Sequence, residues 1–201
     1  KKALLKLSGP MIVAMLILAA YNLVNAIWVA GLGSDALAAV GFVSPIFMVV
    51  VGLSNGLGAG VSSSISRRIG AQDKRGADNT TMHALLLVLA VSVILTVGLF
   101  ITLEPLLIAM GAGDSIGLAM EYGNIVFFVS IFLVFNNIAY AILRGEGDTR
   151  RTMYAMGAVS LINAVLDPIL IYWMGMGMAG AAWGTVISLM IVSGVQIYWL
   201  I

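Results

Sequence analysis

The chain has 201 residues, of which 61% are hydrophobic and only 9% are charged, and its formal net charge is +1. Soluble domains carry about a quarter charged residues. The low charged fraction of this chain, together with its mean hydropathy of +1.08, excludes a water-soluble globular protein. The chain contains no cysteine, which excludes disulfides and thiolate metal sites. The single histidine, His83, cannot form a metal cluster alone.

Six apolar stretches follow one another along the chain, each long enough for the roughly 20 residues that cross a bilayer. They recur along the whole chain, whereas a secretory signal peptide has one short apolar region before its cleavage site. The pattern predicts an all-α integral membrane protein in which residues 1–201 form a single six-helix unit. The predicted spans are residues 8–31, 36–66, 77–103, 119–143, 152–173 and 179–201.

The basic residues indicate how these spans are oriented. All ten lie before the first span, between the second and third, or between the fourth and fifth: Lys1, Lys2, Lys6, Arg67, Arg68, Lys74, Arg75, Arg144, Arg150 and Arg151. The opposite connections hold Asp35, Glu104 and Asp114 but no Lys or Arg. Because basic loops remain in the cytoplasm, the sequence predicts that both termini are cytoplasmic.

Small residues recur every four positions on two spans. The repeats are Gly52, Gly56, Gly60 and Ser64 on the second span, and Gly180, Gly184 and Ser188 on the sixth. Such faces let the backbone of another helix approach closely, so we expect helix packing there. The glycines at 56–60 do not form a phosphate loop, because no Gly-Lys-Ser/Thr ending follows them.

The string Gly145-Glu-Gly-Asp148 matches a motif of intramembrane aspartyl proteases. Those enzymes need two carboxylates close enough to share a proton. Asp148 precedes Asp167 by about 19 residues, which is most of a membrane thickness along a helix. We therefore expect a structured turn instead, in which Asp148 and Thr149 cap the next helix.

Asp167 is the only charged side chain set well inside an apolar stretch. A carboxylate there costs roughly 2.5 to 3.5 kcal/mol on insertion scales, so a bound cation, a proton or a watery cavity must compensate for it. Asn163 lies one turn before it on the same face. Asn25 and Thr185 fall at a similar height, and Tyr21 shares a face with Asn25. This all-oxygen set suits Na⁺ or a proton better than a soft metal.

Pro168 follows this carboxylate directly. Because proline has no N–H, it cannot bond the carbonyl of Ala164. The sequence therefore predicts a free carbonyl and a bend close to Asp167.

Five distinct motifs follow one another along nearly the whole chain: Tyr21–Gly33, Leu37–Gly41, Gly56–Gly60 with Ser66–Ala71, Leu143–Thr149, and Asn163–Ile169. Together they resemble the amino-terminal half of MATE (multidrug and toxic compound extrusion) transporters, most of all the archaeal and DinF-like branch. The Arg-Gly-x-Gly-Asp-Thr string and the Asn-x-x-x-Asp-Pro string are its most specific parts.

The resemblance implies one six-helix lobe of a two-lobe transporter in a prokaryotic plasma membrane. Such a protein is an antiporter without enzyme activity or organic cofactor, which expels amphipathic, often cationic drugs or toxins against Na⁺ or H⁺. The cation site implied for this lobe consists of Asn25, Asn163, Asp167 and Thr185, with Na⁺ at the last three. Candidates for the substrate cleft are Tyr21, Asn136, Asn137 and Tyr140. The implied partners are the substrate, the bilayer and a second lobe, but no nucleic acid.

Two departures from the family leave alternatives open. Relatives commonly have Asp at the place of Asn25, so a site with one acid should bind protons and Na⁺ less strongly. The chain is also about half the expected length, so either a second lobe belongs to it or two copies pair. Tyr140 replaces a carboxamide of some relatives. A non-transporting membrane scaffold is therefore one alternative.

A second alternative is a lobe of the related lipid-linked oligosaccharide flippases. These need a cationic patch for pyrophosphate in the central cleft, and no span interior here contains Lys or Arg. For Asn22, Asn136 and Asn137 an ordinary interhelical hydrogen bond is as good an interpretation as a functional role.

Overall fold

The computed structural model describes the backbone of residues 2–200 and the side chains of residues 8–200. This part of the chain is almost entirely helical and contains no strand, which confirms the predicted fold class. The elements are α1 (Lys2–Ala30), α2 (Ser34–Gly70), α3 (Lys74–Ala109), the 3₁₀ helix η1 (Gly113–Ser115), α4 (Ile116–Phe128), α5 (Ser130–Gly145), α6 (Thr149–Pro168), the π-helix η2 (Ile169–Trp173) and α7 (Gly177–Leu200).

Five membrane-length apolar helices occur within the described residues, and a bent pair of helices makes a sixth span if it is counted as one. The pair is η1 with α4, followed by α5, and it bends by 54°. The sequence predicts one uninterrupted helix here, because no proline or glycine stands at Val129. The structure breaks the helix at that residue. Thr96 of α3 contacts both sides of the break, at Phe127 O (3.5 Å) and Ser130 Oγ (2.7 Å).

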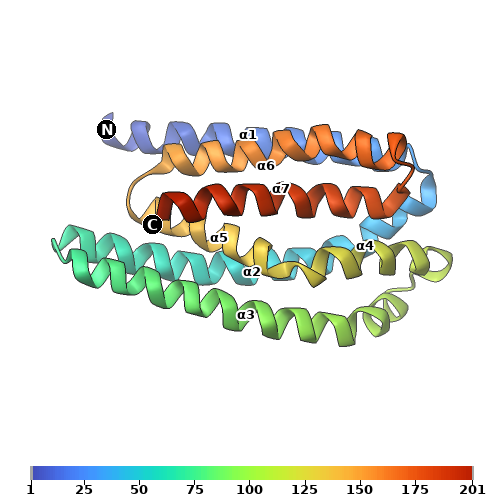
Figure 1. The fold of residues 1–201 in the computed structure, drawn as a ribbon, viewed down its shortest axis with the longest axis horizontal. Coiled ribbons are helices and arrows are strands. Elements are labelled where there is room, and N and C mark those ends of the chain that lie inside the picture. Colours follow the sequence, from blue (N-terminus) through green and yellow to red (C-terminus); the bar gives the residue numbers. More distant parts are fainter. Residues whose placement is uncertain (1, 201) are drawn as a thin grey trace.

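The long helices run alongside one another, with α1 against α6, α2 against α3 and α5, and α7 between the two groups (Figure 1). The core between them is apolar and includes Val50, Phe127 and Ile138. Many large apolar side chains face outward, Trp173 and Tyr198 being more than four-fifths exposed. Since lipid tails can cover such a surface, its exposure agrees with a membrane protein.

The two predicted small-residue faces behave differently. On α7, a Cβ at Gly180 would lie 2.7 Å from the carbonyl carbon of Leu170, so the backbones touch there as predicted. On α2, Gly52, Gly56 and Gly60 have no atom of the described chain near their Cβ positions. The glycine of α2 that packs within this chain is Gly58, against Ala141 of α5. The Gly52 face of α2 is therefore left open.

The glycine-rich string between α5 and α6 forms the predicted turn. Gly147 has a φ of 84°, which favours glycine. Asp148 caps α6 by accepting a hydrogen bond from the backbone N–H of Arg151 at 3.0 Å. Asp148 thus begins the helix that Asp167 nearly ends, and α6 separates the two carboxylates. They cannot share a proton as a protease pair must.

Candidate functional site at Asp167

Asp167 lies where α6 passes into the π-helix η2, one residue before Pro168. The side chain is completely buried. The predicted bend takes another form, because α6 and η2 continue as a single span, Thr149–Trp173, whose last turns are widened into a π-helix. Such π turns often accompany functional sites.

Three helices meet around this carboxylate. Asn25 of α1 donates a hydrogen bond from Nδ2 to Asp167 Oδ2 at 2.9 Å. The same amide nitrogen lies 3.5 Å from the Tyr21 hydroxyl, which accepts. From α7, Gly184 comes so close that a Cβ there would overlap Asp167 Oδ1. The predicted convergence of the first, fifth and sixth spans is therefore present in the structure.

Asn163 and Thr185 form the neighbouring part of the site. Asn163 is completely buried and donates from Nδ2 to Thr185 Oγ1 at 3.2 Å and to Ser188 Oγ at 3.5 Å. Thr185 in turn donates to the carbonyl of Ala181. The predicted residues are thus brought together, but Thr185 bonds Asn163 and not Asp167. Ser188 joins them although its sequence position indicated only close packing.

Two oxygen atoms of this site have no hydrogen-bond partner among the described residues. They are Asp167 Oδ1 and Asn163 Oδ1, and both are buried. A carboxylate oxygen and an amide oxygen only accept, and unpaired buried acceptors are rare enough to need a physical reason. The described residues contain no group of three His, Cys, Asp or Glu side chains that could hold a metal ion. The arrangement can accept a proton or a hard cation of low charge.

Aromatic residues border the carboxylate. Tyr21 of α1 and Tyr122 of α4 both lie within electrostatic range of Asp167. Tyr122 was not among the sequence candidates, because nothing in its own apolar stretch links it to the fifth span. Farther along α1, the Tyr172 hydroxyl of η2 donates to Trp28 O at 2.6 Å. The carboxyl-terminal part of α1 is therefore tied to both α6 and η2.

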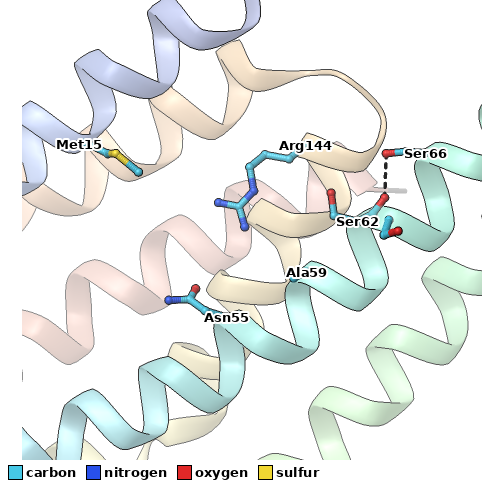
Figure 2. A pocket seen from close by; sticks show the side chains of 7 residues that line it. Met15, Asn55, Ala59, Ser62, Ser66 and Arg144 are labelled. Carbon is cyan, nitrogen blue, oxygen red and sulfur yellow. Dashed lines mark hydrogen bonds between the residues drawn. The ribbon is translucent and has the colours of Figure 1, made fainter.

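A cavity of about 560 Å³ lies apart from this site, between α1, α2 and α5 (Figure 2). Its lining residues are Met15, Asn55, Ala59, Ser62, Ser63, Ser66 and Arg144. None of the residues predicted to bind the cation or the substrate lines it. The cavity is near the turn that joins α5 to α6, since Arg144 immediately precedes that turn.

Comparison with known proteins identifies the family. The MatE family model matches residues 10–169. The chain belongs to the MatE family of MATE transporters. It is 46% identical to a MOP superfamily transporter from Pyrococcus furiosus, with a TM-score of 0.95 over 99% of this chain and 44% of that one. A structure of MATE in the bent conformation gives 47% identity and a TM-score of 0.92 over 99% of this chain and 45% of the other.

Curated relatives include transporters of different names. An FAD transporter from Shewanella oneidensis is 30% identical over 205 residues, which is 100% of this chain and 45% of that protein. The multidrug export protein MepA from Staphylococcus saprophyticus is 29% identical over 194 residues, or 96% of this chain and 43% of the relative. The chain thus spans less than half the length of the relatives it matches. MATE proteins are multi-pass plasma membrane proteins, which agrees with the apolar helices here.

Two of the substrate-cleft candidates lie inside the packed core of this MATE lobe. Asn136 is 1% exposed and joins α5 to α7, since Nδ2 donates to Ser193 Oγ at 2.7 Å and to Leu189 O at 3.2 Å. Tyr140 is 9% exposed, in a cluster with Ala155 and Val192. For Asn136 the interhelical hydrogen bond is therefore the interpretation that the geometry favours.

The other two cleft candidates are half-buried. Tyr21 lies beside the carboxylate site, as described above. Within the described residues, the side chain of Asn137 bonds only the Leu133 carbonyl of its own helix, at 3.0 Å. Both keep part of their surface exposed, so they stay candidates for contact with a substrate.

Proposed function

We propose that this chain is one lobe of a cation-coupled antiporter, and not an enzyme, which exports amphipathic, often cationic drugs or toxins in exchange for Na⁺ or H⁺. Membership of the MATE family supports the transport activity, and a relative named as a multidrug export protein supports the substrate class. The observation that carries the coupling proposal is the fully buried Asp167, whose Oδ1 has no hydrogen-bond partner among the residues that the structure describes.

A bound cation or proton would compensate the buried carboxylate of this site. An ionised carboxylate away from water is costly, and a cation or proton at Asp167 Oδ1 removes that cost. Asn163 Oδ1 supplies a second acceptor from the same helix face. Asn25 of α1 donates a hydrogen bond to the other carboxylate oxygen, Asp167 Oδ2. Loading or release of the ion therefore changes a contact between α1 and α6, and this change is the means by which the ion acts on the lobe.

A second lobe, or a second copy of this chain, completes the transport path in this proposal. The open glycine face of α2 supports it, because Gly52, Gly56 and Gly60 leave room for the backbone of a partner helix. We also propose that both termini are cytoplasmic. A cysteine at the exposed Ala71 should then react with impermeant reagents only from the cytoplasmic side. Labelling from outside would contradict this orientation.

Asp167→Asn tests the coupling in the complete transporter reconstituted into liposomes. The amide can still accept the hydrogen bond from Asn25, so the fold should persist while cation-driven export is lost. Asp114→Asn is the matched control, since it makes the same chemical change at an exposed position in η1. Export that responds equally to an ion gradient in the wild type and in Asp167→Asn would refute the proposal.

A further inference from the structure

Arg144 is half-buried and has no counter-ion in the described part of the chain. Its side chain reaches from the last turn of α5 into the space between α1 and α2, on the side where Asn55 and Met15 lie (Figure 2). Among the described residues it makes neither an ion pair nor a side-chain hydrogen bond. The ion pairs found there engage two other arginines, Arg68 with Asp73 and Arg151 with Asp148.

The nearest acid in the sequence does not neutralise this arginine. Burial raises the pKa of Glu146, and the charged groups that act on it are Asp148, Arg151 and Asp78. No carboxylate lines the cavity either. Burial removes part of the water around the guanidinium, and this loss of hydration is unfavourable when no acceptor replaces the water. A bound anion would offset that cost.

Contacts around the next residue hold Arg144 in place. The single O–H of Ser66 is shared between the carbonyl oxygens of Gly145, at 3.0 Å from Oγ, and Ser62, at 2.8 Å. Gly145 itself packs so closely on α2 that a Cβ would lie 3.0 Å from Ser62 O. The backbone that carries the guanidinium is thus fixed against α2 before any ligand arrives, which reduces the entropy cost of binding.

The wall opposite the guanidinium offers further donors. The side chains of Asn55, Ser62 and Ser63 line the cavity and make no hydrogen bond within the described chain. An arginine fork with hydroxyl and amide donors matches the several oxygens of a phosphate group. The fourth polar neighbour, Ser66, is already engaged.

The remaining wall of the cavity is apolar. Met15 of α1 is 63% exposed and lines it, and the neighbouring Leu16 and Ile12 are 65% and 58% exposed. The cavity is open to its surroundings, and its volume of about 560 Å³ is large enough to admit a phosphate group with an apolar part attached. Donors on one side and methionine on the other suit a molecule with a phosphate group and an apolar part.

We propose that Arg144, Asn55, Ser62 and Ser63 form a binding site for the phosphate group of an amphipathic molecule. The phosphate belongs either to the headgroup of an anionic phospholipid or to a soluble phosphorylated compound. The site shares no residue with the Asp167 site and does not depend on the proposed export, but it requires that the partner proposed for the glycine face of α2 leaves the Asn55 side of that helix accessible.

Titration of the complete, delipidated protein distinguishes these sources. One arm uses short-chain phosphatidylglycerol and the other inorganic pyrophosphate, with binding followed by thermophoresis. Arg144→Gln should weaken binding at least about tenfold, as expected for charged hydrogen bonds, and Arg144→Lys should weaken it less. Arg150→Gln is the matched control, because Arg150 is exposed near the same turn and does not line the cavity. Binding of the lipid alone, of pyrophosphate alone or of both supports the site and names its source.

A second variant covers the case in which Arg144→Gln does not fold. Asn55→Ala alters an exposed side chain that makes no hydrogen bond within the described chain, and it should weaken binding about fivefold. Absence of binding in both arms, as when an acidic side chain of a partner segment already pairs with Arg144, overturns the proposal. Equal weakening by Arg150→Gln, or unchanged affinity in Arg144→Gln and Asn55→Ala, also overturns it.

Discussion

Near each end of this lobe, one charged side chain is withdrawn from water and makes no ion pair among the described residues, and the two side chains lie in opposite settings. Asp167 is completely buried where α1, α6 and α7 meet, and backbone packing at Gly184 leaves its Oδ1 little space. Arg144 is half-buried on the wall of an open cavity between α1, α2 and α5. In our proposal, the closed setting takes a ligand as small as a proton or a single cation. The open setting accommodates a larger molecule.

The largest expected effect comes from filling the closed setting. Gly184→Val places side-chain atoms where Asp167 Oδ1 lies, and it should destabilise the protein by about 1 to 3 kcal/mol and abolish cation binding. The control is Gly194→Val on the same helix, because a Cβ at Gly194 meets no atom of the described chain. Denaturant unfolding in detergent measures both. Comparable losses in the two variants would contradict the close packing inferred at Gly184.

The sequence predicted the parts of the site that follow from spacing along one helix. Asn163 and Asp167 are four residues apart, and this spacing places both on the face that meets α7. The depth estimated for each residue in the membrane also predicted correctly that Asn25 lies near the carboxylate. The partner of Thr185 could not be derived in this way, because depth gives the height of a residue and not the direction in which its helix is turned.

Features that depend on neighbouring helices escaped the sequence. No proline or glycine at Val129 indicates the break in the helix there. The break coincides with hydrogen bonds that involve Thr96 of α3. Likewise, glycine spacing does not distinguish the stripe through Gly52 from the single contact at Gly58. In the sequence, Arg144 indicates only the side of the membrane on which its loop lies, because nothing there places it beside the donors of α2. All three need the packing of segments that are far apart in the chain.

A smaller effect, on stability and on cation binding, should distinguish the two buried carboxamides, Asn136 and Asn163. Asn136→Leu removes bonds between α5 and α7 and should cost about 1 to 2 kcal/mol of stability while cation binding persists. Asn163→Ala should weaken cation binding as well, because it removes an unpaired oxygen of the site. Unfolding and ion titration on the same samples compare them. Loss of cation binding in Asn136→Leu alone would reverse these assignments.

The smallest change adds a second acid to the closed setting. In Asn25→Asp the new carboxylate lies beside Asp167 and replaces a donor with an acceptor. Like charges raise the proton affinity of the pair, and two carboxylates around one cation bind it more tightly. We expect an affinity gain of about tenfold, the equivalent of roughly 1.4 kcal/mol. Titrations with Na⁺ at several pH values measure it, and a weaker affinity for both ions would argue against direct contact.

Ion binding to the purified complete protein, followed by the fluorescence of Trp28, tests the central claim most directly. Trp28 lies on α1 one turn beyond Asn25 and contacts Tyr172 of η2, so it should report occupancy at Asp167. We expect the response to Na⁺ or to pH to disappear in Asp167→Asn and to persist in Arg144→Gln. An unchanged response in folded Asp167→Asn would contradict the assignment of Asp167 as the ion-binding carboxylate.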